Sequence, residues 1–132
     1  MNVKPLFKLM VEKKASDLFF APFAPAKIKI DGKIMPVNKL EMTPKMVKQA
    51  AIELMDEEQL DQFTKELELD FAISEPGLGR FRVNVFHQRG NVSMVLRYIT
   101  AELPTLEELG MPEQMKELVM LRRGLILMVG AT

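Results

Sequence analysis

Apolar and polar residues alternate with two different periods along this chain, and the period changes between segments. Residues 3–14 place apolar side chains among lysines at helical spacing, which predicts a short amphipathic helix. Residues 15–20 are expected to form a strand, and residues 27–30 alternate lysine with isoleucine. An Asp-Gly pair follows, which is typical of a hairpin turn, so residues 33–37 are expected to form the returning strand.

Two further helices are predicted in the middle of the chain. Thr43 is an N-cap residue, and Pro44 occupies the first helical position. Asp56 with Gln59 three residues later resembles a capping box at the start of the next helix. The predicted apolar faces comprise Met46, Val47, Ala50, Ala51, Leu54 and Met55 in the first helix and Leu60 and Phe63 in the second.

A hairpin is predicted after the alternating strand at residues 68–73. Residues 80–86 and 92–99 are strand-like runs on either side of a turn-rich segment. If the turn is centred between Arg89 and Gly90, one face of the hairpin is apolar throughout. That face pairs Phe81 with Tyr98, Val83 with Leu96 and Val85 with Met94.

The same register places Arg82 directly opposite Arg97 on the other face of the hairpin. Like charges in this position destabilise a sheet, and a bound anion would relieve the repulsion. Two guanidinium groups on side chains whose Cβ atoms lie about 5 Å apart can share the oxygens of one phosphate. The alternative is that both arginines extend into solvent. The register therefore makes Arg82 and Arg97 a candidate phosphate clamp.

The organisation changes after residue 100. Residues 105–109 predict a helical turn, and a helix is expected from Pro112 to Arg123. Leu125–Val129 is an uninterrupted apolar run, typical of a strand buried on both faces of a parallel sheet. Since such a strand needs neighbours, we expect the chain to be a fragment that ends where a second, α/β domain begins.

The composition fits one soluble domain and excludes several kinds of site. The 132 residues include 18 Lys and Arg, 18 Asp and Glu, and no cysteine, which removes thiol catalysis, cysteine-based zinc sites and disulfides. His87 has no second histidine to share a metal and is expected to be a loop residue. No signal peptide or membrane span is recognisable, so a cytosolic location is expected.

The charge is uneven along the chain. Nine acidic residues and one lysine lie between Glu53 and Glu75, whereas residues 76–101 contain four arginines and no acid. The acidic stretch is interpreted as a solvated helix face, and the arginine-rich stretch suits phosphate or carboxylate.

In five segments, and over its whole length, the chain resembles the twitching-motility retraction ATPases of type IV pili, the PilT/PilU family of the secretion ATPases. The stretches Asp17-Leu18-Phe19 and Phe86-His87-Gln88-Arg89 are more similar to the PilU branch of the family. The segments are Ala15-Ser16-Asp17-Leu18, Ile30-Asp31-Gly32-Lys33-Ile34, Gly79-Arg80-Phe81-Arg82-Val83-Asn84 with Val95-Leu96-Arg97, Leu106-Glu107-Glu108-Leu109-Gly110, and Arg123-Gly124-Leu125 through Val129-Gly130-Ala131-Thr132.

The resemblance implies an α+β fold. Residues 1–100 would form a PAS-like N-terminal domain with a mainly antiparallel sheet and flanking helices. Residues 101–111 would be an interdomain linker, and residues 112–132 the start of a truncated P-loop ATPase domain. The phosphate loop, G-x-x-x-x-G-K-[ST], would be incomplete, so this fragment is not expected to hydrolyse ATP.

The resemblance also implies a nucleotide site shared with the missing domain. Arg82 and Arg97 would reach the phosphates, Arg80 is a weaker third candidate, and Leu106 would pack on adenine. The start of the phosphate loop would be Gly130, Ala131 and Thr132. The longer parent would use ATP and Mg²⁺, whereas the fragment is expected to hold no cofactor, no catalytic residue and no metal ligand.

The implied parent is a hexameric motor on the cytoplasmic side of the inner membrane at the pilus base. Its partners would be an inner-membrane platform protein and, as a further candidate, a second retraction ATPase, with no nucleic acid. Two alternatives from other classes are a sensory PAS-type ligand-binding module and a sheet that binds single-stranded RNA. The second is disfavoured because Phe81 and Phe86 fall on opposite faces of their strand.

Overall fold

The computed structural model describes residues 3–100 and 103–130. These residues form two compact units whose boundary lies between residues 101 and 102, and each unit is described by itself. The first unit contains three helices and a six-stranded sheet, and the second contains one short helix.

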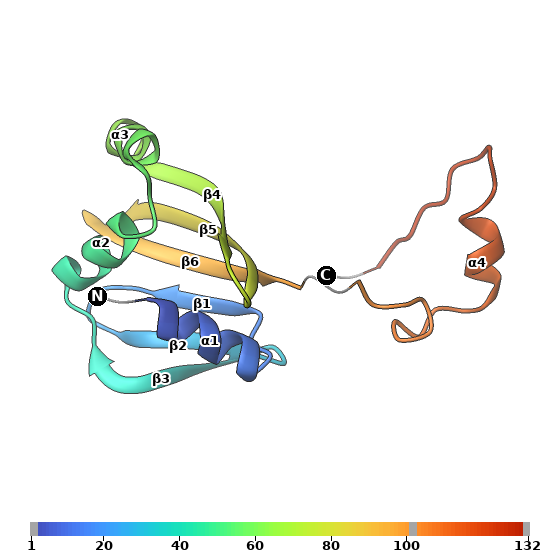
Figure 1. Ribbon diagram of the computed structural model, residues 1–132, viewed down its shortest axis with the longest axis horizontal. Helices are drawn as coiled ribbons and strands as arrows, with labels where there is room; N and C mark the ends of the chain where they lie inside the picture. Colours follow the sequence, from blue (N-terminus) through green and yellow to red (C-terminus); the bar gives the residue numbers. More distant parts are fainter. Residues whose placement is uncertain (1–2, 101–102, 131–132) are drawn as a thin grey trace. The chain divides into compact units, whose positions relative to one another are not determined.

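The first unit is a mixed α+β structure built on one antiparallel sheet, as predicted (Figure 1). The strands lie in the order β3-β2-β1-β6-β5-β4, so the pairing of β1 with β6 joins two three-stranded antiparallel meanders. The strands are β1 (Asp17–Phe20), β2 (Pro25–Ile30), β3 (Lys33–Glu41), β4 (Glu68–Glu75), β5 (Gly79–Gln88) and β6 (Asn91–Ile99). The helices are α1 (Lys4–Glu12), α2 (Pro44–Ile52) and α3 (Glu57–Glu66).

The predicted helix starts are confirmed. The Thr43 side chain accepts a hydrogen bond from the Met46 N–H, and Pro44 is the first residue of α2. Asp56 and Gln59 form a complete capping box at α3: the Gln59 N–H donates to Asp56 Oδ1 over 2.8 Å, and the Asp56 N–H donates to Gln59 Oε1 over 3.1 Å. Each cap satisfies backbone donors that the first helical turn leaves without a partner.

The predicted hairpin register is also confirmed. Phe81 lies opposite Tyr98 and Val83 opposite Leu96, and the same numbering continues to the turn. Arg89 and Gly90 both have positive φ, 52° and 76°, as a type I′ turn requires. A type I′ turn matches the twist of the flanking strands. The turn and the burial of the apolar face therefore favour the same register of β5 against β6.

One face of the sheet is buried under α1 and α2 (Figure 1). Phe7 of α1 stacks on Phe81 of β5 with 4.6 Å between ring centroids, and both rings are almost fully buried. Val47 of α2 is also fully buried in this layer. Burying one such side chain stabilises the fold by about 1.5–3 kcal/mol. The hairpin's fully buried residues on this face are Phe81, Val83, Val85, Met94 and Leu96.

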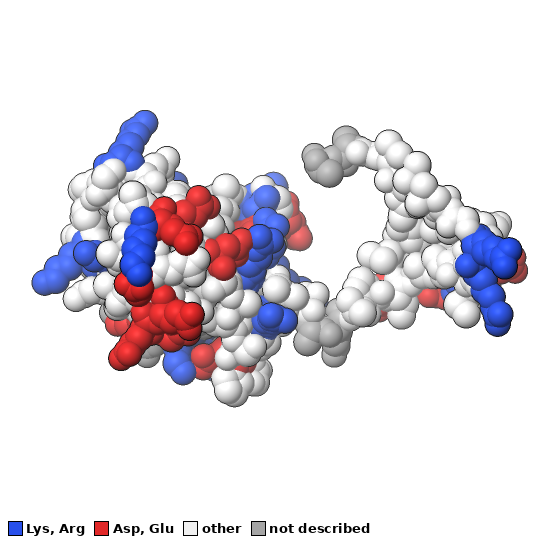
Figure 2. All heavy atoms as spheres, turned by 90° about the horizontal axis from the view of Figure 1, so that it is seen from above, with Lys and Arg blue, Asp and Glu red and all other residues white. Residues whose placement is uncertain are grey.

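The acidic stretch forms exposed surface, as its interpretation as a solvated face requires. Glu57, Glu58, Asp61 and Glu66 of α3 are all exposed. Figure 2 shows several groups of acidic side chains on the surface of the first unit.

The second unit departs from its predicted secondary structure. The predicted turn at residues 105–109 is present, because the Leu109 N–H donates to the Thr105 carbonyl over 3.1 Å. The helix expected from Pro112 to Arg123 is only α4 (Gln114–Leu118), and the expected strand at Leu125–Val129 is wrong, because these residues are irregular and exposed. A strand needs a partner strand for its backbone groups, and residues 103–130 contain no strand to supply one.

The structure also tests the membrane expectation. Within residues 3–100 and 103–130 no helix is long and apolar enough to cross a bilayer.

Candidate functional site

The two arginines predicted to form a clamp lie opposite each other at the centre of the sheet. Arg82 of β5 pairs with Arg97 of β6, and both point to the face that α1 and α2 leave open. Their side chains are about two-thirds exposed, 64% and 66%. The geometry on which the clamp was predicted is therefore present.

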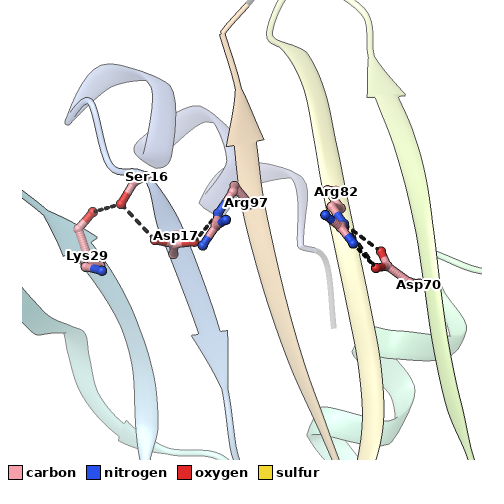
Figure 3. A network of polar contacts seen from close by, with 6 residues as sticks. All are labelled: Ser16, Asp17, Lys29, Asp70, Arg82 and Arg97. Atoms are coloured by element: carbon pink, nitrogen blue, oxygen red, sulfur yellow. Dashed lines mark hydrogen bonds and ion pairs between the residues drawn. The ribbon is translucent and has the colours of Figure 1, made fainter. Parts of the chain in front are cut away.

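Arg97 is bound to a buried carboxylate on the neighbouring strand. Asp17 of β1 lies directly opposite Arg97, and Arg97 Nε donates to Asp17 Oδ1 over 2.9 Å (Figure 3). The Asp17 side chain is only 5% exposed, and it also accepts a hydrogen bond from Ser16 Oγ over 2.9 Å. Two donors therefore hold a carboxylate that has little contact with water.

Arg82 is bound to an exposed carboxylate on the other side. Its Nε lies 3.0 Å from each oxygen of Asp70 in β4, and its Nη2 also donates to Asp70 Oδ2 (Figure 3). Asp70 stands opposite Asn84 rather than Arg82, so the ion pair runs diagonally across the two strands. The Asp70 side chain is 41% exposed.

The Arg82–Asp70 pair shifts both ionisation equilibria. Hydrogen bonding from Arg82, with its charge adding to the effect, holds the pKa of Asp70 below its usual range. The same hydrogen bond and charge raise the pKa of Arg82. Asp70 is therefore ionised at neutral pH, and its negative charge faces the arginine pair.

These contacts answer the question of what relieves the repulsion between the arginines. Each guanidinium is paired with a carboxylate of its own, so a bound anion is not required to offset the repulsion between the two arginines. Both side chains are exposed, as the alternative of two solvated arginines expects, but each is also bound to a carboxylate. Sequence reasoning missed both partners, although two signals were available: Asp17 is a lone acid in an otherwise apolar strand, and Asp70 falls on the arginine face of its alternating strand.

The charged groups surround a shallow hollow of about 310 Å³ on the open face. Arg97 uses only Nε to bind Asp17, and its two Nη atoms make no hydrogen bond to the described residues. Those Nη atoms are available to a phosphate oxygen without loss of the Asp17 contact. The hollow is lined by Asp17, Asp70, Arg82, Asn84, Val95 and Arg97.

The other predicted site residues are distributed over both units. Arg80 shares the face of Arg82 two residues away, is exposed, and has no ion pair within the described part of the chain. Leu106 lies half-buried in the first turn of the second unit, and Gly130 lies in its exposed irregular segment. Ala131 and Thr132 fall outside the described residues.

His87 is in a strand, so its assignment to a loop is wrong. It is the penultimate residue of β5, its ring stacks on Phe63 of α3 at 5.1 Å, and its Nδ1 lies 3.2 Å from the Leu67 carbonyl oxygen. Across residues 3–100 and 103–130, no three His, Cys, Asp or Glu side chains cluster in a way that could hold a metal ion.

Comparison with curated proteins gives strong matches along the whole chain. The type IV pilus ATPase PilU of Pseudomonas aeruginosa is 46% identical over 132 residues, which are 100% of this chain and 35% of that protein. The type IV pilus retraction ATPase PilT of the same organism is 35% identical over 132 residues, 100% of this chain and 38% of that protein. The chain thus spans little more than a third of the curated relatives it matches. No protein-family model matches it.

Solved structures agree with the sequence matches. The pilus retraction motor PilT with bound ADP matches with a TM-score of 0.77 and 34% identity, over 89% of this chain and 35% of that one. The ATPase DotB of Legionella pneumophila matches with a TM-score of 0.65 over 92% of this chain and 35% of that one, and at 16% identity it supports the fold alone. The six-stranded sheet with its flanking helices corresponds to the N-terminal domain of PilT.

Proposed function

We propose that this chain, which is homologous over its whole length to the pilus ATPases PilU and PilT, is the N-terminal domain of a hexameric pilus-retraction motor that hydrolyses ATP. The observation that carries the proposal is the match to PilU, 46% identical with no part of the chain left out. The PilT match adds structural support, because that motor was solved with ADP bound.

In the proposed mechanism the open sheet face closes over ATP held by a C-terminal domain. Arg82 and Arg97 contact the phosphates, and Arg80 is a third candidate. Negative charge on the γ-phosphoryl oxygens is best stabilised by donors that are already in position, which a rigid hairpin provides. Mg²⁺ is proposed to accompany the nucleotide, with Leu106 against adenine and residues 130–132 beginning the phosphate loop.

Loss of the γ-phosphate would then release the sheet from the nucleotide. Residues 100–110 would act as the hinge, so nucleotide state would set the angle between the two domains. In a ring of six subunits, successive angles would drive retraction. The motor would work on the cytoplasmic side of the inner membrane at the pilus base, against a platform protein there and alongside a second retraction ATPase.

Binding of single-stranded RNA has no structural observation in its favour. Three acidic side chains, Glu68, Asp70 and Asp17, lie on the same face as the arginines. They would oppose a polyanionic backbone, on which RNA affinity largely depends.

A sensory module has one observation in its favour, an apolar cavity of about 160 Å³ between α2, α3 and the end of the hairpin. Phe63, Leu60 and Val92 contribute to its wall. Ligand pockets usually have about 300–1,000 Å³, so this cavity suits at most a benzene-sized molecule. A thermal-shift screen with small apolar ligands tests it, and the motor proposal expects no stabilisation.

The proposal is tested on the longer gene product. The codons after Thr132 are expected to encode a Gly-Lys-Ser/Thr sequence, and the purified longer protein is expected to release phosphate from ATP. The 132-residue chain in the same assay serves as the control and is expected to be inactive. A missing Gly-Lys-Ser/Thr sequence, or a longer protein without ATPase activity, would overturn the assignment.

A further inference from the structure

The two arginines of the candidate clamp are held by carboxylates in very different surroundings. Asp17 is 5% exposed, directly opposite Arg97, and fixed by Ser16 as well. Asp70 is 41% exposed, diagonal to Arg82, and has no donor other than Arg82 among the described residues. The first pair is part of the buried structure, whereas water reaches the second from the open face.

The donors engaged in each pair also differ. Arg82 gives both Nε and one Nη to Asp70, which occupies one of the edges through which a guanidinium can bind a phosphate in a bidentate manner. Arg97 gives only Nε to Asp17, which leaves its outer edge open. A phosphate that takes this edge of Arg82 therefore competes with Asp70, whereas a phosphate on the outer edge of Arg97 does not compete with Asp17.

The cost of breaking each pair follows from its burial. A nearly buried carboxylate without an ion-pair partner is strongly unfavourable, so separating Asp17 from Arg97 has a high free-energy cost. An exposed carboxylate is solvated when its partner leaves, and exposed ion pairs contribute little. The hydrogen bonds from Arg82 keep the pKa of Asp70 low, so Asp70 stays ionised and remains a competing anion for Arg82 until a phosphate takes its place.

We propose that Asp70 is a displaceable counter-ion that holds Arg82 until a nucleotide phosphate replaces it, and that Asp17 is a positioning residue that keeps Arg97 aimed at the same phosphate. This inference rests on the proposed function and adds its regulation. Asp70 determines the phosphate concentration at which Arg82 exchanges its carboxylate partner for a phosphate. Asp17 keeps Arg97 in its binding position in the absence of nucleotide.

The test uses inorganic tripolyphosphate at millimolar concentrations as the probe and the 132-residue chain as the protein, because the chain without a C-terminal domain is expected to bind phosphate only weakly. Side-chain Nε–H signals of Arg82 and Arg97 are followed by NMR during a titration, for the wild type and for Asp70→Asn and Asp17→Asn. Glu68→Gln is the matched control, because Glu68 is an acid on the same strand and face whose partner is Asn84 and not an arginine. Thermal unfolding and backbone spectra verify that each variant is folded.

Asp70→Asn is expected to tighten tripolyphosphate binding about three- to fivefold, the size expected for loss of an exposed competitor. The Arg82 Nε–H signal in the free variant should already lie towards its phosphate-bound position. Asp17→Asn should weaken binding and broaden the Arg97 signal, and Glu68→Gln should leave the affinity within twofold of the wild type.

Two other results would overturn the inference in different ways. If Asp70→Asn binds as the wild type does, or if Glu68→Gln tightens binding equally, Asp70 acts only as general negative charge and the counter-ion exchange is wrong. If no variant and no wild-type chain binds tripolyphosphate through Arg82 and Arg97, the phosphate clamp itself fails, and with it the mechanism on which the inference rests. ATPase activity of the longer protein distinguishes that failure from failure of the motor assignment.

Discussion

At the residue scale, Arg82 and Asp70 are linked by ionisation as well as by geometry. Because the folded-state pKa of Asp70 is lowered, the pair adds stability above the pKa of unfolded aspartate, and this is lost as pH falls through the folded value. Both side chains are largely exposed, so solvent screening keeps the contribution small. The protonation state is therefore a better reporter of the contact than the stability.

Arg82→Gln is expected to raise the pKa of Asp70 towards that of an ordinary aspartate. The guanidinium supplies both the hydrogen bonds and the charge that lower the pKa. A carbon-detected NMR titration of the Asp70 carboxyl measures the change, and Lys65→Gln, which removes the partner of Asp61, is the control. An unchanged pKa in Arg82→Gln would show that the ion pair does not persist in solution.

The residues of the site were predictable only in part. The register of one local hairpin was enough to bring Arg82 and Arg97 together, because the turn and the alternating apolar residues lie within a single short segment. Asp17 could not be paired with Arg97 in this way, because β1 and β6 lie far apart in the sequence and their pairing is set by the tertiary fold. The contact of Asp70 with Arg82 was not predicted either, because a diagonal contact can be recognised only when the register of β4 against β5 is known.

At the element scale, Gly79 determines how β5 begins. Its φ of 122° is rare for other residues, and an added Cβ would lie 3.0 Å from the Tyr98 ring. That ring is held in turn by a hydrogen bond from its hydroxyl to the Leu78 carbonyl over 3.1 Å. The strand that carries Arg80 and Arg82 therefore starts from a position that accepts only glycine without rearrangement.

Gly79→Ala is expected to destabilise the chain by about 2–4 kcal/mol, from backbone strain together with displacement of the Tyr98 ring. Gly77→Ala is the matched control, because Gly77 also has positive φ, 77°, but a Cβ there meets nothing within 4 Å. Its expected cost is about 1 kcal/mol. Urea unfolding measures both, and equal costs would contradict a role for the Tyr98 contact.

The elements that local signals specify were predicted well, and those that need partners were not. α2 and α3 begin where their N-caps indicate, and the Arg89–Gly90 turn has the expected backbone. Leu125–Val129 has the composition of a buried strand but no strand beside it within residues 103–130. A continuous apolar run indicates that a segment is buried in the folded protein. A strand also requires a neighbouring strand for its backbone hydrogen bonds, which the run alone does not reveal.

At the scale of the whole molecule, the two faces of the sheet have different roles: one forms the core and the other carries the candidate site. The buried face holds α1 and α2, and this core alone accounts for the order of the first unit. The open face holds the arginines and their carboxylates, of which only Asp17 is buried, and none of them belongs to the apolar core. The chain is similar to PilT and PilU in sequence, and to PilT in fold. A role of this face in a nucleotide-dependent motor is the proposal made from that similarity.

The assignment of residues 112–132 to the start of a P-loop domain stays a prediction. These residues belong to the second unit, and within residues 112–130 the regular structure is α4 alone. The sequence of the longer gene product decides this point, as described above for the ATPase assay.

The central claim, that the paired arginines act on nucleotide phosphate, is tested most directly by ATP turnover of the longer protein with Arg82→Gln or Arg97→Gln. Arg89→Gln is the matched control, because Arg89 lies in the turn of the same hairpin, away from the pair. Each clamp variant is expected to lose more than tenfold in turnover, as removal of a transition-state donor does. Arg89→Gln should retain wild-type turnover. Wild-type turnover in both clamp variants would contradict the claim.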